Sequence, residues 1–221
     1  NLDAPNKRVV LADPAAPTAN AWHEVVSVRD DVVVQSASGL GGRLAVSYLQ
    51  DVQPRYAIHD IDGTHVHDIA FDTIGAVGGG SGRWTSHEAF FTFETLHVPR
   101  TIYRYDVETG ERQVWVEPKA PVDAAHYQVT QHWFASKDGT RVPMFVTHRP
   151  DVTLDGSNPV LLTGYGGFNI SLTPVFSELA TVWLESGGVV AVANLRGGGE
   201  FGESWHQAGM LENKQNVFDD F

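Results

Sequence analysis

The stretch Asn158–Gly202 decides the architecture of this chain. It reads NPVLLTGYGGFNIS over residues 158–171 and GGVVAVANLRGGGEFG over residues 187–202. It contains two short apolar runs, Pro159–Thr163 and Val189–Ala193, which carry no charge and are each followed by a glycine-rich loop. Runs of this kind are typical of strands that are buried on both faces of a parallel sheet.

In open α/β sheets, the loops at the carboxyl ends of the strands carry the chemistry. We therefore expect the working site of this chain around Tyr165–Asn169 and Arg196–Gly202. The span between the two runs supports an α/β arrangement, because Phe176–Glu185 has apolar residues at helical spacing. Strand, glycine loop, helix and strand in this order predict a mostly parallel sheet.

A proline-rich seam divides the chain. Glu117–Pro121 has two prolines in five residues, which cannot continue a strand ladder. We therefore predict one domain over residues 1–120 and a second over residues 121–221. The second domain opens with a predicted hairpin, because Val129–Ser136 and Arg141–His148 flank a turn that contains Asp-Gly.

The first domain contains a weak internal repeat. Three short strand-like segments end in Asp, at Asp13, Asp60 and Asp106, which are 47 and 46 residues apart. Four short strands per unit at such a period are typical of a β-propeller blade, although a plain meander or sandwich also repeats its strands at short intervals. Only about two and a half blades are present and a closed propeller needs at least four, so we expect further blades upstream.

The chain is acidic: 15 Lys and Arg residues stand against 27 Asp and Glu residues, for a formal net charge of −12. This charge argues against nucleic acid and anionic membranes as partners, since both attract basic patches. The absence of cysteine excludes disulfides, thiolate metal sites and a cysteine nucleophile. No apolar run approaches the ~18 residues of a membrane span, and Asn1 opens no signal-like segment from which a location could be read.

The first glycine loop offers a candidate catalytic group. Glycines after a strand let a side chain turn toward a substrate, and Tyr165 is placed where its phenol could leave the loop. A phenol is a neutral donor at pH 7, which suits it to stabilise a developing oxyanion. Phe168, three residues later, would offer a flat apolar wall. The alternative is that both aromatic side chains pack the loop itself.

The second glycine loop allows a competing hypothesis. Gly197–Gly202 fits the dinucleotide-binding pattern G-x-G-x-x-G after a strand, and Asp219 follows near where a ribose-binding acid would fall. Against this, Glu203–Asn213 lacks the apolar stripe of the helix that the motif must open. Asp219 and Asp220 could also act as the paired carboxylates of a glycosidase, but at the start of a helix we expect them to complement its dipole.

Several nearly contiguous motifs resemble the prolyl oligopeptidase family of serine peptidases. They are GYGGFNIS (164–171), AVANLRGGGEFG (191–202) and NKQNVFDDF (213–221), together with Trp205–His206. The resemblance covers essentially the whole chain. It implies a mixed fold, in which the last blades of a seven-bladed β-propeller are followed by the start of an α/β-hydrolase domain.

The resemblance also implies an activity and a set of site residues. The reaction would be cleavage of short proline-containing peptides after proline, without cofactor or metal, by a monomeric protein of the cytoplasm or, alternatively, the periplasm. By position, Tyr165 matches a tyrosine whose hydroxyl forms half of the oxyanion hole, and Phe168 matches an aromatic wall of the proline pocket. The other candidate residues of the active-site loops are Gly166, Gly167, Asn169 and Arg196.

One feature departs from the family pattern. No Gly-x-Ser-x-Gly motif occurs in the sequence, and the nearest match, Gly79–Arg83, fails at its last position and lies in the propeller-like part. In the hydrolase order of Ser, acid and His, all three would follow Phe221, so we expect this chain to be an internal segment of the enzyme. The alternatives are a catalytically inactive fragment, a binding module built from propeller blades or, more weakly, a dinucleotide-binding α/β domain.

Overall fold

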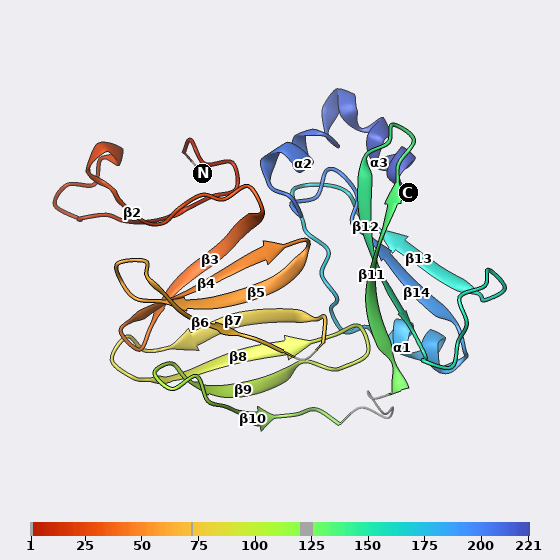
Figure 1. Ribbon diagram of the computed structural model, residues 1–221, viewed down its shortest axis with the longest axis horizontal. Helices are drawn as coiled ribbons and strands as arrows, with labels where there is room; N and C mark the ends of the chain where they lie inside the picture. Colours follow the sequence, from red (N-terminus) through yellow and green to blue (C-terminus); the bar gives the residue numbers. More distant parts are fainter. Residues whose placement is uncertain (1, 72, 120–125) are drawn as a thin grey trace.

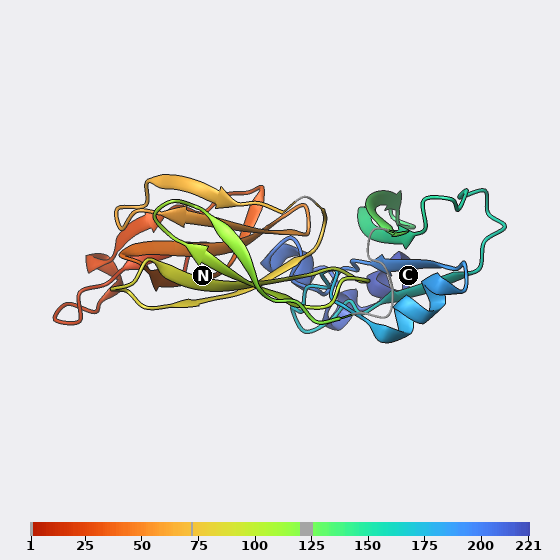
Figure 2. The same cartoon turned by 90° about the horizontal axis from the view of Figure 1, so that it is seen from below.

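The computed structural model describes residues 2–71, 73–119 and 126–221, and these divide into a β-rich half and a mixed half. Figure 1 shows the two halves side by side, with the stacked strands of the first half on the left and the helices on the right. Figure 2 shows the same halves following one another along the long axis of the molecule. The change of architecture that the sequence predicts is therefore present.

The β-rich half consists of short antiparallel strands in three sheets. Its elements are β1 (Val9–Leu11), η1 (Ala19–Ala21), β2 (His23–Val26), β3 (Val32–Leu40), β4 (Arg43–Gln50), β5 (Gln53–His59), β6 (His65–Ile69), β7 (Ala76–Gly82), β8 (Glu88–Glu94), β9 (Thr101–Asp106) and β10 (Arg112–Val116). Two sheets have four strands each, in the orders β3-β4-β5-β6 and β10-β9-β8-β7, while β1 pairs with β2.

The two four-stranded sheets share an apolar core. Along β8, Ala89, Phe91 and Phe93 are buried and alternate with more exposed residues, which is the period of two expected of a strand. Ala89 and Phe91 join Leu40 and Ile58 of the other sheet in one buried cluster. Burial of one face of each sheet against the other holds the two sheets together.

Two of the three repeated aspartates occupy related places in this half. Asp60 follows β5 and Asp106 ends β9, and these strands are the third in chain order of their sheets. The Oδ1 atom of Asp106 accepts hydrogen bonds from the backbone N–H groups of Glu108 and Thr109, both at 2.9 Å. The side chain of Asp106 thereby closes the turn to the next strand.

The mixed half contains a four-stranded sheet and three short helices. Its elements are β11 (Gln128–Ala135), β12 (Arg141–His148), β13 (Val160–Gly164), α1 (Glu178–Glu185), β14 (Val189–Ala193), α2 (Glu203–Gln207), η3 (Leu211–Asn213) and α3 (Gln215–Asp220). The predicted hairpin is confirmed by the antiparallel pairing of β11 with β12. The predicted helix is also confirmed: Ser177 Oγ caps α1 by accepting from the N–H of Ala180 at 3.2 Å.

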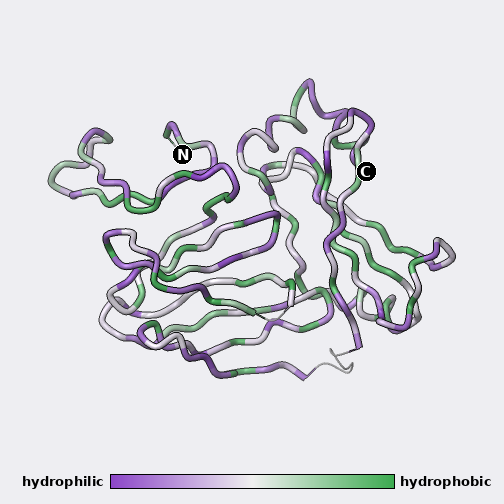
Figure 3. The backbone as a smooth tube through the Cα atoms, in the orientation of Figure 1, coloured by the Kyte–Doolittle hydropathy of each residue, from purple (hydrophilic) through white to green (hydrophobic). Residues whose placement is uncertain are grey.

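Two predictions about this sheet are wrong. The order is β11-β12-β14-β13, and within the described part of the chain only β13 and β14 run parallel, so the sheet is mixed rather than mostly parallel. Figure 3 shows β13 and β14 as mostly apolar segments. However, only β14 is buried throughout, because β13 lies at the edge and leaves Val160 and Leu162 53% and 41% exposed. An apolar run indicates a strand fit for burial but not its place in the sheet.

The two halves meet at the hairpin tip between β4 and β5. Val52, at this tip, is fully buried and clusters with Val129 and Phe201 of the mixed half. Gln131 Nε2 donates a hydrogen bond to the carbonyl of Asp51 at 2.6 Å. The predicted domain boundary between residues 120 and 121 lies outside the described residues and stays a prediction. Among the helices of the described residues, none is long and apolar enough to cross a membrane.

Candidate active site

The loop after β13 presents two aromatic side chains to the solvent. β13 ends at Gly164, and Tyr165 and Phe168 follow it with 48% and 83% of their surface exposed. Gly166 and Gly167, between them, are buried. The loop therefore keeps its backbone inside and both rings outside, at the carboxyl end of a strand.

The backbone conformation explains how the rings come to face outward. Gly166, Phe168 and Asn169 have positive φ angles of 60°, 53° and 58°. Glycine adopts this conformation freely, and a β-carbon on Gly166 would also lie 2.8 Å from the carbonyl oxygen of Arg196. For a bulky residue such as Phe168 the conformation costs on the order of 1–3 kcal/mol. Contacts elsewhere must hold the loop in place.

The second glycine-rich loop provides such contacts. The N–H of Asn169 donates to the carbonyl of Gly197 at 3.1 Å, and Lys214 Nζ donates to the carbonyl of Gly166 at 2.8 Å. At Gly197, where φ is 90°, a β-carbon would lie 2.7 Å from the oxygen of Gly166. The two loops that the sequence singles out therefore lie backbone against backbone, and glycine is required where they touch.

Arg196 lies beneath these loops and is buried. Its Nη2 atom lies 2.6 Å from Asp220 Oδ1, and its Nη1 atom lies 2.6 Å from Asp138 Oδ2. The hydrogen bond to Asp220, followed by that to Asp138, raises the pKa of Arg196 above its usual range. The bond from Arg196 also holds the pKa of Asp138 well below its usual range. Arg196 therefore cross-links its own loop, the segment of Asp138 and the segment of Asp220.

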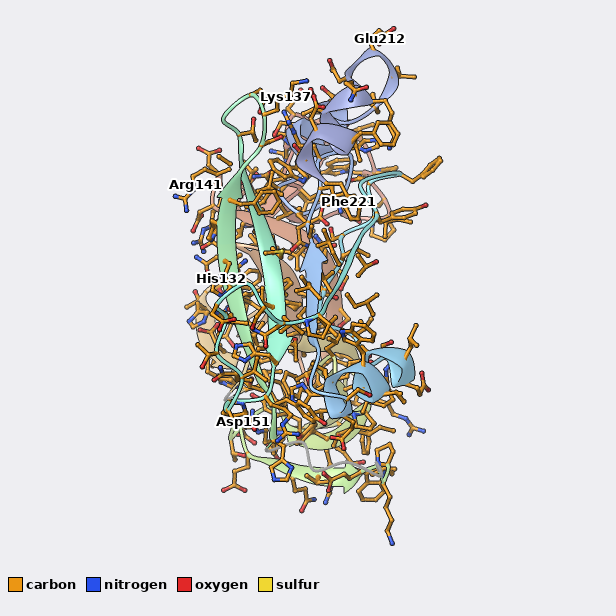
Figure 4. All side chains as sticks on the ribbon, turned by 90° about the vertical axis from the view of Figure 1, so that its right-hand side faces the viewer. His132, Lys137, Arg141, Asp151, Glu212 and Phe221 are labelled. Atoms are coloured by element: carbon orange, nitrogen blue, oxygen red, sulfur yellow. The ribbon has the colours of Figure 1, made fainter. Side chains whose placement is uncertain are left out.

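The expectation that Asp219 and Asp220 complement the dipole at the start of a helix is wrong, because the first turn of α3 contains no acidic residue. The carboxylate of Asp220 instead accepts from the N–H and the guanidinium of Arg196. Asp138 belongs to the β11–β12 turn, next to Lys137, and Figure 4 shows Lys137 at the same end of the molecule as Glu212, just before α3. The ion pairs of Arg196 therefore join this turn to α3.

Glu200 is a second carboxyl group buried in this region. Its Oε1 atom accepts from the N–H of Leu172 at 3.0 Å and from Asn194 Nδ2 at 3.4 Å. Within the described residues, its Oε2 atom has no hydrogen-bond partner, and no cation contributes to its pKa shift. Burial raises the pKa of Glu200 to about 7, because the charged form is disfavoured away from water.

Two of the N–H groups that a dinucleotide phosphate would need in the second loop already donate to carbonyl groups of the chain. The N–H of Gly197 donates to the carbonyl of Trp205 at 2.9 Å, and that of Gly202 donates to the carbonyl of Gly199 at 3.2 Å. The helix that follows, α2, has only five residues. The geometry of this loop therefore does not support the dinucleotide hypothesis.

Comparisons with known proteins decide the family. The family model described as "Prolyl oligopeptidase, N-terminal beta-propeller domain" matches residues 1–118, and the model described as "Prolyl oligopeptidase family" matches residues 174–221. The chain belongs to the prolyl oligopeptidase family. The resemblance seen in the sequence is thereby confirmed, and so is the assignment of the first half to a β-propeller rather than to a plain meander or sandwich.

Members of the prolyl oligopeptidase family with curated names are much longer than this chain. A prolyl endopeptidase of Elizabethkingia meningoseptica is 37% identical over 219 residues, which are 99% of this chain and 31% of the relative. Prolyl oligopeptidase A of Galerina marginata is 37% identical over 227 residues, which are 100% of this chain and 30% of the relative. This chain therefore spans about a third of the length of these relatives.

Solved structures of prolyl oligopeptidases share the fold. One, from a study of two prolyl endopeptidases and the role of inter-domain dynamics in catalysis and specificity, has a TM-score of 0.93 at 43% identity and covers 99% of this chain and 32% of that chain. Prolyl oligopeptidase B of Galerina marginata, bound to a 35mer hydrolysis and macrocyclization substrate, has a TM-score of 0.91 at 31% identity. The match covers 100% of this chain and 31% of that chain.

The candidate residues from the prolyl oligopeptidase resemblance fall into two groups. One loop carries the residues Tyr165, Gly166, Gly167, Phe168 and Asn169, and Arg196 packs below it. Sequence reasoning missed three supports of this loop: Asn194, Glu200 and Lys214. Their contacts join residues that are 22 to 48 positions apart. The only signal for Asn194 and Glu200 was that polar residues interrupt an apolar, glycine-rich run, and Lys214 gave none.

No Gly-x-Ser-x-Gly serine accompanies Tyr165 in this segment of a prolyl oligopeptidase. The nearest match to the motif, Gly79–Arg83, begins on β7 of the β-rich half. In the described part of the chain, His, Asp and Glu side chains form no group of three or more that could hold a metal ion. The 221 residues of this chain therefore lack the motif that would supply a serine nucleophile.

Proposed function

We propose that the full-length protein is a serine endopeptidase that cleaves short peptides on the carboxyl side of proline by acyl transfer. The observation that carries this proposal is the exposed phenol of Tyr165 at the carboxyl end of β13, on a loop braced by a second loop. A serine outside this chain would attack the peptide carbonyl, activated by a histidine and an acid. The Tyr165 hydroxyl and one backbone N–H would donate to the resulting oxyanion.

We also propose that the mixed half begins an α/β-hydrolase sheet. β13 lies at the edge of its sheet with exposed apolar side chains at Val160 and Leu162, whereas parallel strands are normally paired and covered. A further parallel strand beside β13 would end at the same edge as Tyr165. In this fold the nucleophile lies on the turn directly after such a strand, within reach of a peptide that touches Tyr165.

The test of the catalytic role is Tyr165→Phe in the full-length protein. Loss of the hydroxyl removes one oxyanion donor, so kcat on a fluorogenic proline peptide should fall by on the order of 10- to 1000-fold. Tyr103→Phe, in β9 of the β-rich half, is the matched control and should leave kcat unchanged. An unchanged kcat in the Tyr165 variant would remove this residue from the mechanism.

Phe168 would form an apolar wall for the substrate proline. Its ring is open to solvent, so a proline ring could pack against it without rearrangement of the loop. Phe168→Ala should raise KM for the proline peptide by about 10-fold, in line with the loss of one buried apolar contact. A change confined to kcat would assign Phe168 to another task.

A catalytically inactive fragment is the second candidate, and the absent Gly-x-Ser-x-Gly motif favours it for these 221 residues alone. An active-site serine probe should label the full-length protein and leave the isolated chain unlabelled. Labelling of the isolated chain would contradict our placement of the nucleophile. The net charge supports the absence of nucleic-acid and anionic-membrane partners; a monomer in the cytoplasm, or alternatively the periplasm, stays a prediction.

A further inference from the structure

The loop that carries Tyr165 and Phe168 is held at its far end by two buried polar residues. We propose that Asn194 and Glu200 are positioning residues that clamp this loop, and that Glu200 does so as a neutral carboxylic acid. The proposal rests on the proposed function, because it states how the same site keeps its shape.

The clamp holds both backbone groups of one residue, Leu172. Glu200 Oε1 accepts from its N–H at 3.0 Å, and Asn194 Nδ2 donates to its carbonyl at 2.6 Å. Leu172 follows Phe168 by four positions, and its side chain packs against the cluster that contains Leu184 and Val190. β13 fixes the first end of the loop at Gly164, so Leu172 is where its second end is fixed.

The clamp residues are themselves held by the sheet. Asn194 is fully buried directly after β14, and its N–H donates to the carbonyl of Pro143 at 3.0 Å. Glu200 folds back toward Asn194 across Gly198. An ideal β-carbon at Gly198 would overlap Glu200 Oε2, so the missing side chain makes room for the carboxyl group.

Unpartnered oxygen atoms favour the neutral acid. Among the buried side chains of the described residues, Glu200 Oε2 and Asn194 Oδ1 lack a hydrogen-bond partner. An ionised carboxylate only accepts hydrogen bonds, so its second oxygen would stay buried, charged and unpaired, which is costly. A proton on Oε2 would turn that atom into a donor, and the carbonyl oxygen of Ile170 borders the same space beside Gly198 as an acceptor.

The charged groups nearest Glu200 border two cavities, and none of them is among the causes that shift its pKa. Three acidic residues of the β-rich half line one cavity with Glu200, and a lysine and a glutamate line the neighbouring cavity with Gly199. Burial raises the pKa of Glu200 to about 7. A neutral Glu200 adds no negative charge to the region in which the substrate oxyanion would develop. The charged groups that border the two cavities are Asp30, Asp31, Asp51, Lys7 and Glu203.

The test compares Glu200→Ala, Glu200→Gln and the control Glu203→Gln in the full-length protein. Glu200→Ala opens the clamp, and kcat/KM for a proline peptide should fall about 10-fold or more. Both kcat and KM should change, because the loop carries Tyr165 and Phe168. Glu200→Gln keeps an acceptor for Leu172 and replaces the O–H donor by N–H, so at pH 6 it should stay within about threefold of wild type. The control should match wild type.

Two further readouts separate this role from a merely structural one. The ratio of wild-type to Glu200→Gln kcat/KM should fall as the pH rises through the pKa of Glu200, about 7, since ionisation removes the O–H donor. Infrared difference spectra of the same two proteins should show the carbonyl stretch of one protonated carboxyl group in the wild type. This signal should disappear over the same pH range.

Three results would overturn the proposal: wild-type kinetics in a folded Glu200→Ala variant, an equal loss in the Gln and Ala variants, or no protonated-carboxyl signal at pH 6. If Glu200→Ala does not fold, the pH profile of Glu200→Gln and the infrared titration decide. If the wild type cleaves no proline peptide, the proposed function fails, whereas the infrared titration still tests the neutral acid.

Discussion

Asp220 and Glu200 are buried to nearly the same degree in the corner where the two glycine loops meet, yet their surroundings differ. Asp220 is 1% exposed and pairs with the Arg196 guanidinium at 2.6 Å. Glu200 is 2% exposed and accepts from the N–H of Leu172 and the amide of Asn194, while no cation contributes to its pKa shift. Among the described residues, its Oε2 atom has no hydrogen-bond partner. The comparison shows that burial by itself does not set the state of a carboxyl group, because the partner decides it.

The two carboxyl groups also serve different purposes in the fold. Through Arg196, Asp220 joins the second glycine loop to the end of α3, and Asp138 adds the β11–β12 turn. A guanidinium can bind two carboxylates in fixed directions, so this pair cross-links distant segments. Glu200 instead acts locally on the loop of the candidate site, through Leu172.

Breaking the ion pair should have the largest effect. Asp220→Asn leaves the buried Arg196 guanidinium without its main counter-charge, and removal of one partner from a buried pair costs about 3–5 kcal/mol. Urea unfolding of the full-length protein at pH 7 measures this loss. Asp138→Asn is the matched control: its carboxyl is the solvent-exposed partner of Arg196, so its loss should be clearly smaller. Equal losses would contradict the assignment of Asp220 as the main partner.

The pH dependence of the free energy of unfolding should show whether the pKa of Glu200 is raised in the folded state. Its pKa is about 7 in the folded chain and 4.5 ordinarily, so between these values the folded state keeps a proton that the unfolded state releases. The free energy of unfolding should therefore fall as the pH rises through this window and be flat outside it. The difference is on the order of 3 kcal/mol. Unfolding curves of wild type and Glu200→Gln from pH 4 to pH 8 measure it, and parallel pH profiles would exclude the raised pKa.

The smallest of these effects tests whether the Glu200 carboxyl group fills the space beside Gly198. Gly198→Ala places a methyl group against Glu200 Oε2 and 2.8 Å from the carbonyl oxygen of Ile170, which should cost about 1–3 kcal/mol. In the Glu200→Ala background the first overlap disappears, so the cost of Gly198→Ala should decrease. A double-mutant cycle on urea unfolding measures the coupling. Strict additivity would show that the carboxyl group does not occupy this space.

Much of the candidate site could be predicted from local pattern. The glycines after an apolar run indicated where the backbone turns. Tyr165 and Phe168, the aromatic residues among these glycines, lie exposed on that turn. The edge position of β13 could not be predicted, because a charge-free run describes the strand and not its neighbours. The roles of Arg196, Glu200 and Asp220 were missed or misjudged for the same reason: each depends on which distant group faces it.

By itself, the sequence determined the local order of this protein: strands of period two, the Asp-Gly hairpin, the Ser177-capped helix and the glycine turns, all of which depend on neighbours within a few positions. It also carried the motifs that identify the family. Only the tertiary structure decided which buried groups meet. Arg196 and Asp220 are 24 positions apart and Leu172 and Glu200 are 28 apart, and no short-range period encodes such distances. The free energy of a buried charge depends on its partner. The protonation state of a buried side chain is therefore decided only when the chain folds and brings that partner to it.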